Sequence, residues 1–134
     1  MSTALVIDYT PAISTLLKTI LQTVSGFDRV DTAVRGDTAV SLLNRTDYDL
    51  VILEPVVPYG DERLLTWLIR NRPSVLSRTI LMTTPPLAAD FRAEIARSNV
   101  ALVFEKPFDL AAIGAAFRSC SRQARARFSA AARA

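Results

Sequence analysis

The sequence predicts an α/β fold built on a parallel β-sheet that is covered by helices on both faces. Short apolar runs alternate with stretches of helical periodicity five times along the chain. The apolar runs are continuous and do not alternate with polar residues, which is typical of strands buried on both faces. The connections are short, as expected for strand–helix units packed together in a chain of 134 residues.

The first half of the chain contains three predicted strands and two predicted helices. The strand at residues 4–7 ends at Asp8, and a helix begins near Pro11, with Thr10 as its N-cap and Gly26 after its end. Its apolar residues fall on one helical stripe: Ile13, Leu16, Leu17, Ile20, Leu21 and Val24. The elements that follow are a weaker strand, a second helix and a third strand: residues 29–34, the segment opened by Gly36-Asp37, and residues 49–53.

The second half repeats the pattern twice after a third helix. Asp61 is the predicted N-cap of the helix at residues 62–71, and a fourth strand follows at 78–83. The remaining elements are a helix at 87–98, a fifth strand at 101–104 and a last helix that Asp109 caps. This last helix carries an apolar stripe: Leu110, Ile113, Phe117 and Cys120.

Composition excludes several classes of protein. Half of the residues are hydrophobic and 22% are charged, which indicates a globular chain. The chain has no histidine, and this removes Ser/His and Cys/His catalysis and most transition-metal sites. Cys120 is the only cysteine, and the N-terminus lacks the pattern of a signal peptide. We therefore expect a cytoplasmic protein with no membrane span and no internal disulfide.

Polar side chains follow four of the predicted strands. Asp8 follows the first strand, Glu54 the third and Thr83 ends the fourth, while the fifth leads to Lys106. Ligand-binding groups of such sheets collect at the carboxyl ends of the strands, near the point where the strand order reverses. We therefore expect two carboxylates, a hydroxyl and an ammonium group to lie at one edge of the sheet.

Four stretches of the sequence together resemble the receiver domain of response regulators in bacterial two-component signalling. They are LVIDYTPAI, DYDLVILEPVVP, TILMTT and VFEKPFDL, and they span about the first 120 residues in the order and at the spacing of that family. The KPF turn is the most specific of them. The resemblance implies a flavodoxin-like (βα)5 three-layer sandwich with a five-stranded parallel sheet in the strand order 2-1-3-4-5.

In that family, an acidic pair after the first strand and an aspartate at the end of the third bind magnesium. The same aspartate accepts a phosphoryl group from a histidine kinase. The resemblance places Asp8 at the first position of the pair, but Tyr9 at the second and Glu54 at the phosphoacceptor position. Val56 stands where the family uses only a backbone carbonyl.

Three further positions of the family contact or respond to the phosphoryl group. Thr83 matches the switch hydroxyl and Lys106 matches the phosphate-contacting lysine, whereas Val103 stands where an aromatic or polar switch side chain is usual. Magnesium requires oxygen ligands, and a tyrosine phenol stays protonated near pH 7. We therefore expect magnesium binding to be weak or lost, with Asp8, Glu54 and Val56 as the remaining candidate ligands and no other cofactor.

Three roles are open for Glu54. In the first, it is a carboxylate at a solvent-facing strand end, satisfied by Lys106 and backbone N–H groups. In the second, it is a built-in mimic of the phosphorylated state that also accepts a hydrogen bond from Thr83. In the third, it is a true phosphoacceptor. The extra methylene moves its carboxylate by about 1.5 Å. A misplacement of about 1 Å can cost on the order of 100-fold in rate, so the last role is the least favoured.

These observations predict a pseudo-receiver, a signalling module that is not an enzyme and acts by protein–protein contact without normal aspartate phosphorylation. By resemblance, a homodimer partner, sensor kinase or output protein binds the face from Leu87 to Cys120, on which we expect Phe91. The alternatives are an atypical receiver that still accepts phosphate and a DNA-associated regulator that acts through its tail or a missing output domain. A nucleotide-binding domain is disfavoured, because no Gly-rich phosphate loop is present.

Charge is distributed unevenly between two predicted parts of the chain. Residues 1–120, the predicted receiver-like domain, carry a net charge of −1, and residues 121–134 carry +4 and no acid. We expect this Arg/Ala-rich tail to be an extension of the last helix or a linker. Contact of the tail with nucleic-acid phosphates is a minor alternative.

Overall fold

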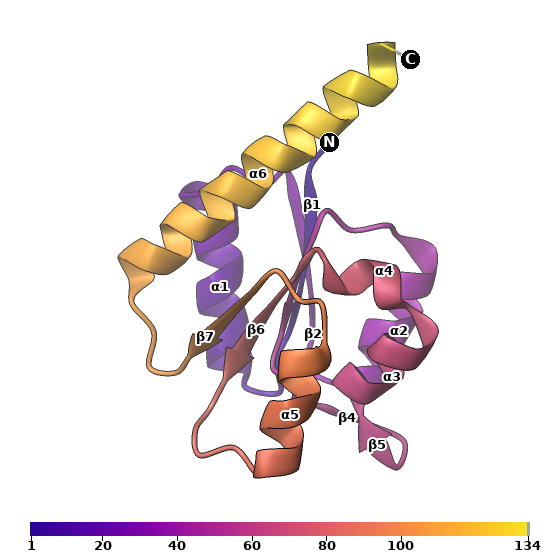
Figure 1. Ribbon diagram of the computed structural model, residues 1–134. Coiled ribbons are helices and arrows are strands. Elements are labelled where there is room, and N and C mark those ends of the chain that lie inside the picture. The colour runs from indigo at the N-terminus through magenta and orange to yellow at the C-terminus, as the bar shows by residue number, and fades with distance from the viewer. Residues whose placement is uncertain (134) are drawn as a thin grey trace.

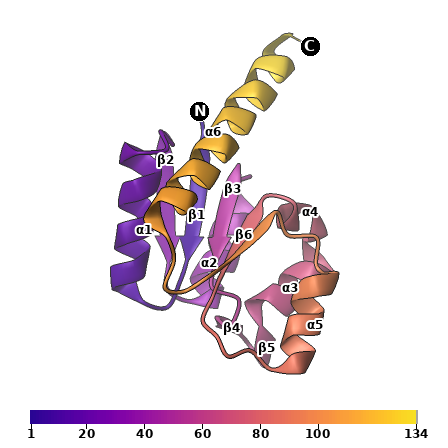
Figure 2. The same ribbon diagram turned by 60° about the vertical axis from the view of Figure 1, so that its left-hand side comes forward.

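The computed structural model describes the backbone of residues 1–133 and the side chains of residues 1–123. A five-stranded parallel sheet forms the centre, and its helices lie on both faces (Figures 1 and 2). The sheet contains β1 (Thr3–Ile7), β2 (Arg29–Ala33), β3 (Leu50–Leu53), β6 (Thr79–Thr83) and β7 (Leu102–Glu105). The helices are α1 (Pro11–Thr23), α2 (Gly36–Arg45), α3 (Leu64–Asn71), α4 (Pro73–Leu76), α5 (Ala89–Arg97) and α6 (Leu110–Arg133).

The strand order is β2-β1-β3-β6-β7, which confirms the predicted order 2-1-3-4-5. The labels differ because a two-stranded hairpin, β4 (Pro58–Tyr59) and β5 (Glu62–Arg63), lies between β3 and α3. The sequence pattern did not reveal this hairpin or the four-residue helix α4. In this order β1 has β2 on one side and β3 on the other, so the strand order reverses between β1 and β3.

Two apolar clusters hold the layers together, one on each face of the sheet. On one face, α1 and α6 cover the sheet, with Leu17, Leu21 and Phe117 fully buried against it. On the other face, α2 to α5 cover the sheet around Leu64 and Leu68. Alternate residues of β1 point into the two clusters, which is why its apolar run is continuous.

The two edge strands differ from the expectation that every strand is buried on both faces. All described residues of β1, β3 and β6 are buried, but β2 is only partly buried and β7 is largely exposed. Leu102 and Val103 are 44% and 45% exposed. An apolar run in the sequence does not reveal whether its strand will lie at the centre or at the edge of the sheet.

Of the three predicted N-caps, one is wrong. Thr10 is the N-cap residue of α1, as predicted, although its side chain makes no capping hydrogen bond; its backbone N–H donates to Asp8 Oδ1 at 2.8 Å. Asp61 lies in the turn between β4 and β5, and α3 begins only at Leu64. The third prediction is confirmed, since Ala111 N donates to Asp109 Oδ1 at 2.9 Å at the start of α6.

Helix α5 packs against the apolar cluster on its face of the sheet and has side-chain contacts with β5 and α3. Phe91 is its one fully buried side chain, which corrects the expectation that Phe91 lies on an exposed face. The Arg63 guanidinium lies 4.0 Å from the centre of the Phe91 ring, a cation–π geometry. The Thr66 hydroxyl donates to Glu94 Oε1 at 2.9 Å, so α3 and α5 are also joined by a hydrogen bond.

Helix α6 continues through the predicted domain boundary at residue 120 and ends at Arg133. The tail side chains beyond residue 123 lie outside the described side chains, so the boundary and the nucleic-acid contact remain predictions. No helix in the described part of the chain combines the length and apolar character needed to cross a membrane.

Candidate functional site

The parallel sheet brings Asp8, Glu54 and Lys106 together at its carboxyl edge. Asp8 directly follows β1 and Glu54 directly follows β3, and the two strands are paired, with Ile7 opposite Leu53. The Glu54 N–H donates to the Ile7 carbonyl at 2.9 Å, which continues the ladder to the site. Lys106 follows β7, and its N–H donates to the Thr83 carbonyl at 2.7 Å.

The Lys106 ammonium group lies between the two carboxylates. Its Nζ donates to Asp8 Oδ2 at 2.8 Å and lies 2.9 Å from Glu54 Oε2. Asp8 Oδ1 accepts the Thr10 N–H, so both oxygens of Asp8 have a donor. Burial lowers the pKa of Lys106, but its hydrogen bonds to Asp8 and its contact with Glu54 raise the pKa more, and the net shift is upward. The lysine is therefore a fixed cation at neutral pH.

Glu54 is a buried group and not the solvent-facing carboxylate that one prediction described. It is 1% exposed, and within the described residues neither of its oxygens receives a hydrogen bond of good geometry. The pairing with Lys106 is therefore chiefly electrostatic. Burial raises the pKa of the Glu54 carboxyl, and Lys106 only partly opposes this shift. Glu54 is the least well compensated charge of the site.

We expect the Glu54→Gln variant to gain stability relative to the wild type as the pH rises. The pKa of Glu54 is higher in the folded chain than its ordinary value of 4.5. The contribution of Glu54 to the free energy of unfolding is therefore fully present below about pH 4.5 and is lost as the pH rises through the folded pKa. The loss is about 1.4 kcal/mol for each unit by which the folded pKa exceeds the ordinary one. Urea unfolding at pH 4 and pH 7 measures this, with the exposed Glu105→Gln as control. A difference between wild type and variant that does not change with pH would contradict it.

Thr83 does not donate to Glu54, contrary to what the mimic role requires. Its side chain is buried at the end of β6, and the hydroxyl donates to the Phe104 carbonyl on the adjacent strand at 3.3 Å. The hydroxyl thus joins β6 to β7. Of the four polar groups expected at this edge, two carboxylates and one ammonium group interact directly, and the hydroxyl is engaged elsewhere.

The side chains of the other predicted positions do not join the charged cluster, and only the backbone N–H of Val56 reaches it, where it acts to lower the pKa of Glu54. Tyr9 is 52% exposed, and Val56 and Val103 also expose much of their side chains. For magnesium, the donor set fits poorly, because the Lys106 ammonium contacts both carboxylates and the position of the second acid holds Tyr9. Among the described residues, no group of three or more His, Cys, Asp or Glu side chains is arranged to hold a metal ion. The expected weakness of magnesium binding remains a prediction.

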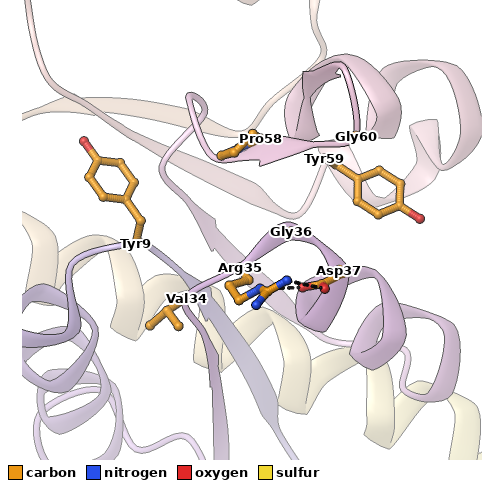
Figure 3. A pocket seen from close by; sticks show the side chains of 8 residues that line it. All are labelled: Tyr9, Val34, Arg35, Gly36, Asp37, Pro58, Tyr59 and Gly60. Carbon is orange, nitrogen blue, oxygen red and sulfur yellow. Dashed lines mark hydrogen bonds and ion pairs between the residues drawn. The ribbon is translucent and has the colours of Figure 1, made fainter.

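An open pocket of about 400 Å³ lies beside the charged cluster, and the sequence pattern did not indicate it. Its walls come from the segments that follow β1, β2 and β3, including the first residues of α2 and the β4–β5 hairpin (Figure 3). The lining residues are Tyr9, Val34, Arg35, Gly36, Asp37, Pro58, Tyr59 and Gly60. Tyr9 and Val34, which follow the first two strands, expose apolar side chains to this pocket, and their exposure is visible only in the structure.

Comparison with known proteins agrees with this geometry. The family model of the response regulator receiver domain matches residues 4–118. No curated protein matches the chain by sequence. Among solved structures, the signal receiver domain of a putative Luxo repressor protein from Vibrio parahaemolyticus has 17% identity and a TM-score of 0.73, over 94% of each chain.

Two further solved structures share the fold. A CheY-like response regulator receiver domain protein from Methanospirillum hungatei JF-1 has 16% identity and a TM-score of 0.75, over 95% of this chain and 98% of that one. The signal receiver domain of a signal transduction histidine kinase from Syntrophus aciditrophicus has 20% identity and a TM-score of 0.73, over 92% of each chain. These likenesses establish the fold, and the match of the family model over most of the sequence establishes that the chain belongs to the response regulator receiver domain family.

Proposed function

We propose that this receiver domain is a pseudo-receiver, which signals through protein–protein contact and does not undergo normal phosphorylation. The observation that carries the proposal is the position of Lys106 between Asp8 and Glu54. Phosphoryl transfer depends almost entirely on positioning and on charge neutralisation by the metal. Here the lysine neutralises part of the charge of both carboxylates, and Tyr9 supplies no carboxylate to a metal.

Glu54 is then a fixed structural charge and not a complete mimic of a phosphoryl group. A carboxylate has one charge and two oxygens, whereas a phosphoryl group has nearly two charges and three oxygens. The pairing of Glu54 with Lys106 reproduces one contact that a phosphoryl group makes in the family. The engagement of Thr83 with Phe104 supports the view that the hydroxyl contact is not reproduced.

Intact mass after incubation with acetyl phosphate and Mg²⁺ tests the proposal. We expect no gain of a phosphoryl group by the wild type. The Glu54→Asp variant restores the acceptor, and Tyr9→Asp with Glu54→Asp also restores the acidic pair, so we expect the double variant to gain one phosphoryl group. Tyr9→Asp with Glu54→Gln is the matched control without an acceptor. A phosphorylated wild type would show that the domain is a working, atypical receiver.

The partner surface is the face from Leu87 to Cys120, proposed as the contact for a second copy, a kinase or an output protein. Its exposed apolar side chains include Leu102, Val103 and Leu110, and the charged Arg92 and Arg97 lie on α5. A mixture of charged and apolar residues suits a self-complementary contact. The cytoplasmic location is likewise a proposal, supported by the single cysteine.

A further inference from the structure

We propose that the pocket between Tyr9, Gly36 and Pro58 binds a small, planar, uncharged aromatic compound. The pocket lies at the carboxyl edge of the sheet, between the segments that follow β1, β2 and β3. In open α/β sheets, ligands bind at this edge where the strand order reverses, and here the reversal is between β1 and β3. The inference shares Tyr9 with the proposed function, but it requires neither the ion pair of Lys106 nor the absence of phosphorylation.

The turn at Asp8 places the aromatic side chain of Tyr9 at the mouth of this pocket. Asp8 is buried and accepts the Thr10 N–H, which fixes the backbone around Tyr9. The Tyr9 side chain is left half-exposed at one end of the pocket, and Tyr59 stands at the other end (Figure 3). Two exposed apolar side chains, Tyr9 and Val34, thus line the same pocket.

The walls of the pocket are held at a fixed separation. At Gly36, an added Cβ would lie 2.2 Å from the Pro58 carbonyl oxygen, so the two loops meet in backbone contact. The Tyr59 ring packs edge-on against Trp67, with centroids 5.3 Å apart. The Leu64 N–H donates to the Val57 carbonyl at 2.7 Å and closes the loop that carries Pro58. A pocket with fixed walls lowers the conformational cost of binding.

The charges of the pocket disfavour a multiply charged ligand. Its two charged lining residues are Arg35 and Asp37, and Arg35 Nε and Nη2 donate to the two Asp37 oxygens at 3.2 and 2.9 Å. The pair has no net charge, and the guanidinium keeps N–H groups that Asp37 does not use. Aromatic and aliphatic side chains form most of the remaining wall. A flat ring with one acceptor oxygen therefore suits the pocket, since it can pack on Tyr9 and accept from Arg35.

Titration of the ¹⁵N-labelled 134-residue protein with 2-naphthol tests the inference, without any phosphodonor. We expect saturable shifts confined to the amides of Tyr9, Gly36, Gly60 and their neighbours, with a dissociation constant on the order of 1 mM, as is usual for so small a ligand. Naphthalene-1,5-disulfonate has the same ring with two charges, and we expect it not to bind there. Shifts scattered over the surface, no saturation, or equal binding of the disulfonate would overturn the inference.

Variants at one position separate a specific site from general apolar adsorption. Tyr9→Ala should weaken 2-naphthol binding about threefold to tenfold, because a ring contact is lost, while Tyr9→Phe should bind as the wild type does. Leu110→Ala removes an equally exposed apolar side chain at the start of α6 and should have no effect. If Tyr9→Ala binds as the wild type does, the inference is wrong. A wild type that accepts phosphate would contradict the proposed function and leave this result unaffected.

Discussion

The Lys106→Met variant is expected to lose about 3–5 kcal/mol of the free energy of unfolding at pH 7, because two buried carboxylates then lose their shared cation. Asp8 and Glu54 are each 1% exposed, and Lys106 Nζ contacts both. Methionine keeps most of the volume of the lysine stem, so the loss reports charge and not packing. Urea unfolding monitored by the Trp67 fluorescence measures it. Lys18→Met, at the chain's other lysine, is the control.

A double variant separates the contributions of the two carboxylates to this loss of stability. Glu54→Gln removes the poorly compensated charge, so Lys106→Met should cost less in that background than in the wild type. The cost should also shrink at pH 4, because the raised pKa of Glu54 allows its carboxyl to be protonated there and relieves that charge. If Lys106→Met costs less than about 1 kcal/mol at pH 7, the range of a solvent-exposed pair, the ion pair does not stabilise the site as we infer.

The Gly36→Ala variant is expected to lose about 1–3 kcal/mol, through a steric clash alone. The added methyl carbon would lie 2.2 Å from the Pro58 carbonyl oxygen and 3.2 Å from Tyr59 Cβ. Because a backbone carbonyl cannot rotate out of the way, α2 or β4 must move. Thermal unfolding measures the loss, and the amide shifts of Gly60 and Tyr59 should change with it.

Gly114→Ala is the matched control for that substitution. Gly114 lies within α6, where an added Cβ meets Val24 Cγ1 at 3.5 Å and Arg118 Nη1 at 3.6 Å, both ordinary contacts. Alanine is favoured over glycine in a helix by up to about 1 kcal/mol, so this variant should be as stable as the wild type or more stable. Equal effects of the two substitutions would show that the contact between Gly36 and Pro58 does not restrict the loops.

The sequence was sufficient to predict the elements whose pattern is set by burial. The continuous apolar runs at β1, β3 and β6 arise because each strand faces an apolar cluster on both sides, and such runs are visible without a structure. The pairing of Lys106 with Asp8 and Glu54 followed from the rule that parallel strands end at the same edge. The short β4–β5 hairpin and α4 contain too few residues to show any periodicity.

The predictions about the site that were wrong concern features that depend on which residues surround a side chain. The burial of Glu54 results from its position between Asp8, Lys106 and the surrounding loops, and no local pattern encodes it. The sequence does not show which acceptor the Thr83 hydroxyl uses. The Phe104 carbonyl comes within hydrogen-bonding distance because β6 and β7 are paired. The pocket beside Tyr9 requires three loops that are far apart in the sequence.

The exposure of β7 has a consequence for local unfolding. Edge strands with few buried contacts open more readily than central strands, so amide exchange should be faster in β7 than in β1 or β3. The cation of the site follows this weakly held strand, whereas its two carboxylates follow central ones. Each opening of β7 therefore separates Lys106 from Asp8 and Glu54. The ion pair therefore opposes the opening of the edge strand β7, and a partner that binds β7 would stabilise the ion pair by making this opening rarer.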